Sequence, residues 1–236
     1  IIALMADGNK NPSPSHTTWI GTPGYDGVNA PNVKTATFNG TLTLNGTAAP
    51  FTGSTASSEV TIGVEHQLWS HRGSGDWITV GAYSTFENKG LIHLNKGNNL
   101  VGILIDVEAW NNNDGPAHKT INNGTIKITA GDTTNDPNGG NSIGIDYGQY
   151  TDCTFKSELT VGNVIVGGKK NYGLRMADIF SSTDPAYFDR GTTIKSGGAT
   201  KKILVKGEEN VGVSIAKFLS SAKDSNPIAG ITEGLN

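Results

Sequence analysis

The sequence predicts an all-β protein, a right-handed parallel β-helix with loop insertions, and two recurring phrases support that prediction. The first phrase is Gly-x-apolar-x-apolar, and the second is apolar-Gly-apolar. The first phrase begins at Gly40, Gly90, Gly124 and Gly162, and again at Lys201 without the Gly. The second begins at Ile62, Val101, Ile143, Tyr172 and Val211. The phrases alternate strictly, and successive first phrases stand about 34–50 residues apart, a period typical of repeat arrays.

Strands fit this repeat better than helices or propeller blades. Apolar residues at alternate positions have the two-residue period of a strand, whereas helical repeats need apolar spacings of three and four. Propeller blades need four strands joined as a meander and usually carry a blade signature, which the sequence lacks. We therefore expect about five to seven coils, each with two or three short strands that pair in parallel with the same strands of the next coil.

Stacking of the first phrase would build a continuous apolar spine. We expect it to contain Leu42, Leu44, Ile92, Leu94, Ile126, Ile128, Val164, Val166, Ile203 and Val205. The residues between them should face solvent, including Thr41, Thr43, His93, Thr125, Lys127 and Asn163. Asn99, Asn141, Asn171 and Asn210 precede the second-phrase Gly. Asn tolerates turn geometry, and stacked copies can form a hydrogen-bonded amide ladder.

Residues 1–236 are expected to form a single β-helical unit. Residues 1–35 would be an irregular first coil, and residues 36–236 the repeat coils. Neither end resembles a cap. A signal peptide would have a basic region before its apolar stretch, and the apolar start of this chain has none. The chain is therefore expected to be a segment of a longer protein. The longest apolar stretch is shorter than the roughly 18 residues of a membrane span.

Composition argues against a nucleic-acid partner. Charged residues make up 17% of the chain, and the formal net charge is −3. A nucleic-acid-binding protein usually shows a basic run or stripe, and the sequence contains none. The single cysteine, Cys153, excludes an intramolecular disulfide and a cysteine metal cluster.

The sequence does not predict a catalytic site. Ser142, in "GGNSIG", is the nearest string to a nucleophile motif, but it lies in the second phrase. Arg175, Asp146 and Asp106 follow second-phrase strands, and we interpret them as solvated outward positions. The alternative is the groove of a polysaccharide lyase or glycoside hydrolase, in which such residues converge for acid–base chemistry.

No metal or cofactor is expected either. Asp7, Asn9 and Asn11 imitate the start of an EF-hand loop, but Thr18 stands where the bidentate acid belongs. Asp132, Asp136 and Asn138 could ligate Ca²⁺, yet the same residues are what a turn requires. His66 and His71 have no recognisable metal-site spacing.

Two insertions are the candidate ligand-binding sites. The stretch 109–119 places Trp110 beside Asn112, Asp114 and His118, an aromatic ring and polar groups that suit a sugar. The stretch 177–191 contains Phe180, Tyr187 and Arg190, residue types enriched at interfaces. The alternative is that these aromatic residues fold back and cover the flank of the helix.

The strings "GTIKITAG", "NSIGI" and "NKGNNLVGI" resemble the passenger repeats of bacterial type V autotransporters, particularly large fusobacterial outer-membrane adhesins. The resemblance covers roughly residues 36–215. It implies a β-helical passenger on the cell surface, preceded by a cleaved signal and anchored through a C-terminal barrel outside these residues. A minority of this family carries enzymatic activity, but without a catalytic motif we expect none in this segment. The resemblance further implies adhesion to a glycan or protein receptor on host cells or other bacteria, or a stalk for an adhesive tip.

Overall fold

The chain is a right-handed parallel β-helix whose cross-section has three sides. The computed structural model describes residues 2–5, 18–19, 34–46, 61–69, 84–108, 118–149, 157–176, 186–187, 193–215 and 218–219. These residues form strands and turns and contain no helix. Five coils each contribute one strand to each of three parallel sheets. The fold class and the parallel pairing predicted from the sequence are therefore confirmed.

Each side of the helix is one sheet, which we name A, B or C. Sheet B contains β3 (Lys34–Phe38), β6 (Ser84–Asn88), β9 (His118–Asn122), β12 (Ser157–Thr160) and β16 (Thr193–Lys195). Sheet C contains β4 (Thr41–Asn45), β7 (Leu91–Lys96), β10 (Thr125–Ile128), β13 (Asn163–Val166) and β17 (Ile203–Val205). Sheet A contains β5 (Thr61–Trp69), β8 (Leu100–Glu108), β11 (Ile143–Gln149), β14 (Tyr172–Met176) and β18 (Val211–Ile215).

Four short strands lie outside this repeat. Sheet A continues beyond β5 with β1 (Ile2–Met5) and then β2 (Thr18–Trp19), which makes it seven-stranded. A separate pair consists of β15 (Ala186–Tyr187) and β19 (Phe218–Leu219). In the order of the chain, each of the five coils runs through sheet B, then sheet C, then sheet A.

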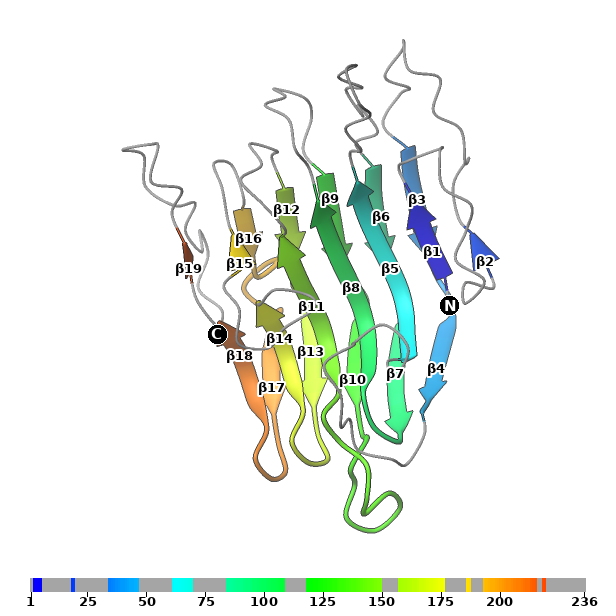
Figure 1. The fold of residues 1–236 in the computed structure, drawn as a ribbon, viewed down its shortest axis with the longest axis vertical. Helices are drawn as coiled ribbons and strands as arrows, with labels where there is room; N and C mark the ends of the chain where they lie inside the picture. Colours follow the sequence, from blue (N-terminus) through cyan, green and yellow to red (C-terminus); the bar gives the residue numbers. More distant parts are fainter. Residues whose placement is uncertain are drawn as a thin grey trace, which may run out of the picture.

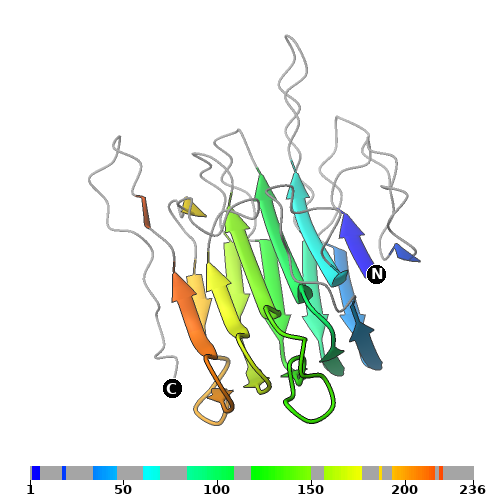
Figure 2. The ribbon, with the colours of Figure 1, turned by 60° about the horizontal axis from the view of Figure 1, so that its bottom comes forward.

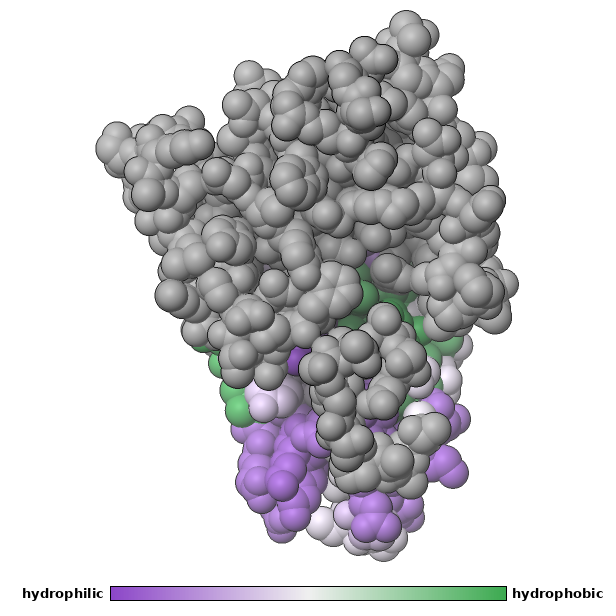
Figure 3. Space-filling model, in the orientation of Figure 1, coloured by the Kyte–Doolittle hydropathy of each residue, from purple (hydrophilic) through white to green (hydrophobic). Residues whose placement is uncertain are grey.

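The winding can be followed in the ribbon. In Figure 1 the chain rises along sheet A in front and descends behind it through sheet B above and sheet C below. Each coil moves it from the side of β3 towards the side of β18, which makes the winding right-handed. Figure 2 shows the same order of strands from below. The turns from sheet C to sheet A lie at the lower end, where the surface in Figure 3 is mainly hydrophilic.

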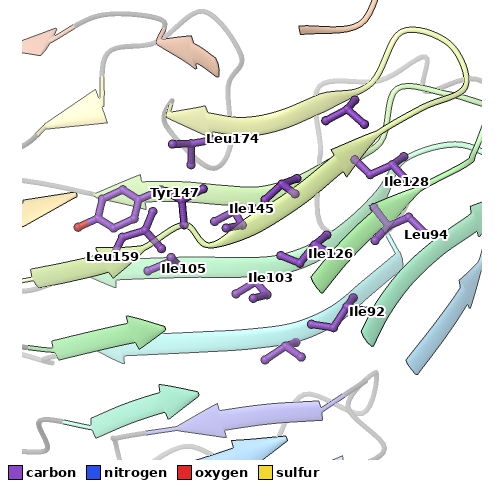
Figure 4. Packing of buried hydrophobic residues seen from close by; sticks show 14 of the residues in the cluster. Ile92, Leu94, Ile103, Ile105, Ile126, Ile128, Ile145, Tyr147, Leu159 and Leu174 are labelled. Carbon is purple, nitrogen blue, oxygen red and sulfur yellow. The ribbon is translucent and has the colours of Figure 1, made fainter. Parts of the chain in front are cut away.

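Stacked apolar side chains form the core, as the first phrase predicts. Leu42, Ile92, Ile126, Val164 and Ile203 are register partners across sheet C, and the same holds two residues later in each strand. Four of the central residues, Ile92, Leu94, Ile126 and Ile128, have no exposed surface. Figure 4 shows them facing side chains of sheet A such as Ile103, Ile145 and Leu174.

The outward positions are confirmed as well. Thr41, Thr43 and Lys127 are exposed, and His93, Thr125 and Asn163 are partly exposed. The alternation of the first phrase therefore separates the inside of the helix from its outer face.

The second-phrase Gly stands where each sheet A strand bends. A Cβ on Gly144 would lie 2.7 Å from the Gly173 carbonyl oxygen and 3.1 Å from Val164 Cγ1, a core atom. Gly144 and Ile145, although adjacent, thus both face the interior. Ile143, before them, is buried but does not belong to the core cluster. Only a residue without a side chain lets the strand turn inward here while the neighbouring coils keep their spacing.

The first-phrase Gly marks the corner between sheets B and C, and it predicts a matched pair of mutants. A Cβ on Gly124 would lie 2.1 Å from the Gly90 carbonyl oxygen of the preceding coil. A Cβ on Gly40, in the first coil, would meet only the Phe38 ring at 3.5 Å. Gly124→Ala should cost about 1–3 kcal/mol in the free energy of unfolding, and Gly40→Ala less than about 0.5 kcal/mol. Urea unfolding of both variants measures this, and equal costs would mean that coils do not stack at this corner.

The predicted amide ladder is wrong for Asn99, Asn141, Asn171 and Asn210, because these residues occupy two different positions of the turn. Asn99 and Asn141 have the left-handed φ values of 57° and 51°. Asn171 and Asn210 stand one residue later, where each side chain accepts a backbone N–H from the preceding coil. Ser142 N donates to Asn171 Oδ1 at 2.9 Å, and Asn171 N donates to Asn210 Oδ1 at 2.8 Å.

An amide ladder does occur at the corner between sheets B and C. Asn88 Nδ2 donates to Asn122 Oδ1 at 2.8 Å, and Asn122 Nδ2 donates to the Val161 carbonyl oxygen at 2.8 Å. Both side chains are fully buried. The ladder therefore supplies hydrogen bonds to polar groups that the stacked coils remove from water.

Candidate functional site

Of the seven predicted ligand-binding residues, the structure describes two, His118 and Tyr187, and of these two only the backbone. His118 begins β9, and Tyr187 ends β15. The other five, Trp110, Asn112, Asp114, Phe180 and Arg190, lie outside the described residues. How these side chains lie relative to one another therefore stays a prediction.

Topology brings both insertions to the same corner of the helix. The first leaves sheet A at Glu108 and returns to sheet B at His118, and the second leaves at Met176 and returns at Thr193. The strands from which they leave, β8 and β14, are separated in sheet A by β11 alone. Two strand spacings correspond to about 10 Å along the helix axis. The predicted loops therefore start and end close enough to contribute to one binding surface.

Asp146 and Arg175 form a buried ion pair on the outer face of sheet A. Arg175 Nε donates to Asp146 Oδ1 at 3.0 Å, and Nη2 donates to Oδ2 at 2.5 Å. Asp146 is almost fully buried, and Arg175 is 21% exposed. The expectation of solvated side chains is therefore wrong for Asp146, although both residues do point outward. The side chain of Asp106 is not described.

Burial and pairing act on Asp146 in opposite directions. Burial raises the pKa of the Asp146 carboxyl group, while the hydrogen bonds and charge of Arg175 lower it, and burial has the larger effect. The strand β15 lies close to β11, which carries Asp146. The insertion with Tyr187 thus approaches the strand that carries Asp146.

The candidate metal residues that the structure describes are engaged in turns and in the core. Asp136 Oδ2 accepts Gly97 N at 2.7 Å and Gly131 N at 2.9 Å, which fixes the insertion 129–142 to the neighbouring coil. Asp132 Oδ1 accepts the backbone N–H groups of Thr134 and Asn135, and these bonds lower its pKa. The turn interpretation fits both carboxylates. In the described part of the chain, no three His, Cys, Asp or Glu side chains gather as a metal site.

Two other candidates of the sequence analysis, His66 and Ser142, are buried and hydrogen-bonded within the helix, and the remaining ones are not described. His66 is buried, and its Nδ1 lies 2.7 Å from Thr120 Oγ1. Ser142 is buried, and its Oγ donates to the Gly140 carbonyl oxygen at 3.2 Å. His71 and the stretch Asp7, Asn9 and Asn11 lie outside the described residues.

The outer face of sheet C lacks acidic residues, a feature that the sequence analysis missed although it predicted six of the outward positions. Alternation and register place fifteen outward positions on it. They are Thr41, Thr43, Asn45, Leu91, His93, Asn95, Thr125, Lys127, Thr129, Asn163, Ile165, Gly167, Lys202, Leu204 and Lys206. All are described, and none is acidic, although the whole chain has a net charge of −3. The signal in the sequence is the lack of Asp and Glu at alternate positions of every first phrase.

Comparison of the chain with known proteins identifies no relative. No family model matches the chain, and no curated protein or solved structure matches it either. Nor does its described part contain a helix long and apolar enough to cross a membrane.

Proposed function

We propose that the chain is a β-helical segment of a bacterial surface adhesin and that it binds through the connections from sheet A to sheet B. The observation that carries the proposal is where the long connections occur. Between sheets A and B they span 70–83, 109–117, 150–156 and 177–192. The corner between sheets B and C has two residues in each of the first four coils: Asn39–Gly40, Lys89–Gly90, Asn123–Gly124 and Val161–Gly162.

A rigid helix with long connections at one corner suits binding better than catalysis. Extra residues in a loop cost little closure entropy, so such loops diversify without disturbing the stacked core. In solenoids, insertions that gather on one face commonly form the binding face. Connections from sheet C to sheet A are also long in two coils, at 46–60 and 129–142, but the latter is held as a turn by Asp136. The resemblance to autotransporter passengers supports the same function.

A polysaccharide lyase or glycoside hydrolase is the second candidate. The buried Asp146, with a raised pKa beside Arg175, favours it, since catalytic acids are often perturbed in this way. However, both carboxylate oxygens of Asp146 already accept hydrogen bonds from Arg175. An assay for reducing or unsaturated products released from uronates or host glycans tests this alternative. Product release that Arg175→Ala abolishes would favour the enzyme over the adhesin.

Binding of the purified chain to a glycan array and to host and bacterial cells tests the proposal. We expect binding that the double variant Trp110→Ala, Tyr187→Ala removes. The variant Thr85→Ala, Thr193→Ala on the outer face of sheet B is the matched control and should bind normally. Retained binding in the aromatic variant would mean that the insertions only cover the helix. If the chain binds nothing, it is a spacer for an adhesive tip elsewhere.

A further inference from the structure

The outer face of sheet C has the charge and surface chemistry of a site for an acidic polymer. Three lysines, Lys127, Lys202 and Lys206, are exposed on it, and none of them has an ion-pair partner among the described residues. Elsewhere in the described chain, Lys119 and Lys195 both pair with Glu158, while Lys169 and Lys170 pair with Glu208 and Glu209. Lys96, at the end of β7, and Lys201, which precedes β17, also have no ion-pair partner there, so the outer face of sheet C carries three of the five unpaired lysines whose side chains the structure describes.

The backbone fixes the arrangement of these three lysines. Lys202 and Lys206 flank β17, and the ladder includes them, since Val164 N donates to the Lys202 carbonyl oxygen and Lys206 N to that of Val166. Four residues along a strand span about 13 Å, and Lys127 lies two strands away, at about 10 Å. The lysines are thus held apart on a rigid surface, where they can contact separate charged groups of an extended ligand.

Polar groups on the same face as the lysines can hydrogen-bond a polyol. Thr41, Thr43 and Thr125 expose hydroxyl groups on this face, and Asn163 exposes an amide. His93, between Thr43 and Lys127, contacts Thr129 Oγ1 through Nε2 at 2.8 Å. Its pKa is lowered by burial and, to a lesser extent, by the charge of Lys127. Glu208 and Glu209, which follow Lys206 in the chain, are paired with Lys169 and Lys170.

We propose that the outer face of sheet C binds a linear anionic polysaccharide, with Lys127, Lys202 and Lys206 contacting its carboxylate or sulfate groups. This inference goes beyond the proposed function, because it adds a second binding surface, separate from the connections between sheets A and B, and names its ligand class. The face fits a nucleic acid less well, because it carries no Phe, Tyr or Trp on which bases could stack. It also fits a membrane poorly, because its apolar residues Leu91, Ile165 and Leu204 are all partly buried.

Solution binding of the whole chain to polysaccharides in low salt tests the proposal. The probes are hyaluronate for carboxylates, chondroitin sulfate for sulfates and neutral dextran. We expect binding to at least one anionic probe but not to dextran, and weaker binding in high salt, because added ions screen exposed charges. Lys127→Gln, Lys202→Gln and Lys206→Gln together should weaken it about tenfold or more, since three exposed charge contacts are lost. The triple Arg variant should retain it.

The matched control removes the same charge elsewhere, with Lys119→Gln, Lys170→Gln and Lys195→Gln together. Equal weakening in this control would overturn the proposal in favour of a general charge effect. Equally strong, lysine-dependent binding of duplex DNA or of vesicles with anionic lipid would also overturn it. The two proposals fail separately. Lysine-dependent polysaccharide binding without cell binding would contradict adhesion alone, whereas cell binding by the Gln variant at full strength, without polysaccharide binding, would contradict this inference alone.

Discussion

Ile126→Ala should destabilise the chain by about 2–5 kcal/mol, the usual cost of removing most of a buried aliphatic side chain. Ile126 has no exposed surface and stands in the middle strand of sheet C, between Ile92 and Val164. The coils above and below are held by their own core contacts and backbone ladders, so they cannot collapse into the space left behind. A cost near the upper end of the range is therefore expected.

Lys127→Ala is the control for this measurement, because it changes the next residue of the same strand. Lys127 is exposed on the outer face, so its loss should change the free energy of unfolding by less than about 0.5 kcal/mol. Urea denaturation followed by circular dichroism compares the two variants. Similar costs at both positions would contradict the assignment of alternate residues to the inside and the outside of the helix.

Arg175→Ala should cost about 3–5 kcal/mol at neutral pH, because it leaves the buried Asp146 carboxylate without its partner. The cost should be smaller near pH 4. Arg175 lowers the pKa of Asp146, and burial raises it from the ordinary value of 3.8. Without Arg175 only the raising effect remains, so the folded variant binds a proton that its unfolded chain releases above that value. Stability of the variant therefore falls as pH rises through the folded pKa.

Asp146→Asn in the Arg175→Ala background separates charge from packing. The neutral amide keeps the shape of Asp146 but has no charge to desolvate, so the double variant should lose most of the pH dependence seen in the single one. Unfolding free energies from pH 4 to pH 8 measure both. If Arg175→Ala costs the same at every pH, Asp146 is not held as a buried carboxylate.

Two sheets of the helix could be predicted from the sequence because their strands carry a strong pattern. Sheet C has apolar residues at alternate places, such as Ile126 and Ile128, and sheet A has a Gly at each bend, such as Gly144. Sheet B was not located, since its strands lack the alternating pair of inner apolar residues and most contribute a single one to the core, such as Phe86 or Leu159. In β9 the buried side chains are Thr120 and Asn122, which a hydrophobic pattern does not detect.

The candidate sites were harder to predict than the fold for a physical reason. Burial of an outward side chain such as Asp146 depends on whatever lies over the sheet, which no local pattern encodes. The lack of acids on sheet C was visible residue by residue. That these positions form one continuous surface follows only from the register, which places Lys127, Ile165 and Leu204 side by side.

In-register disulfide formation tests the stacking of the coils most directly. In a Cys153→Ser background, Thr125→Cys and Asn163→Cys place thiols on register partners in the neighbouring strands β10 and β13. Their Cα atoms should be about 5 Å apart, within the range of a disulfide. The account predicts rapid intramolecular oxidation of this pair, detected by mass spectrometry, and little oxidation of Thr125→Cys with Ile165→Cys, two residues out of register. Equal oxidation of both pairs, or oxidation of the second pair alone, would contradict a parallel β-helix in this register.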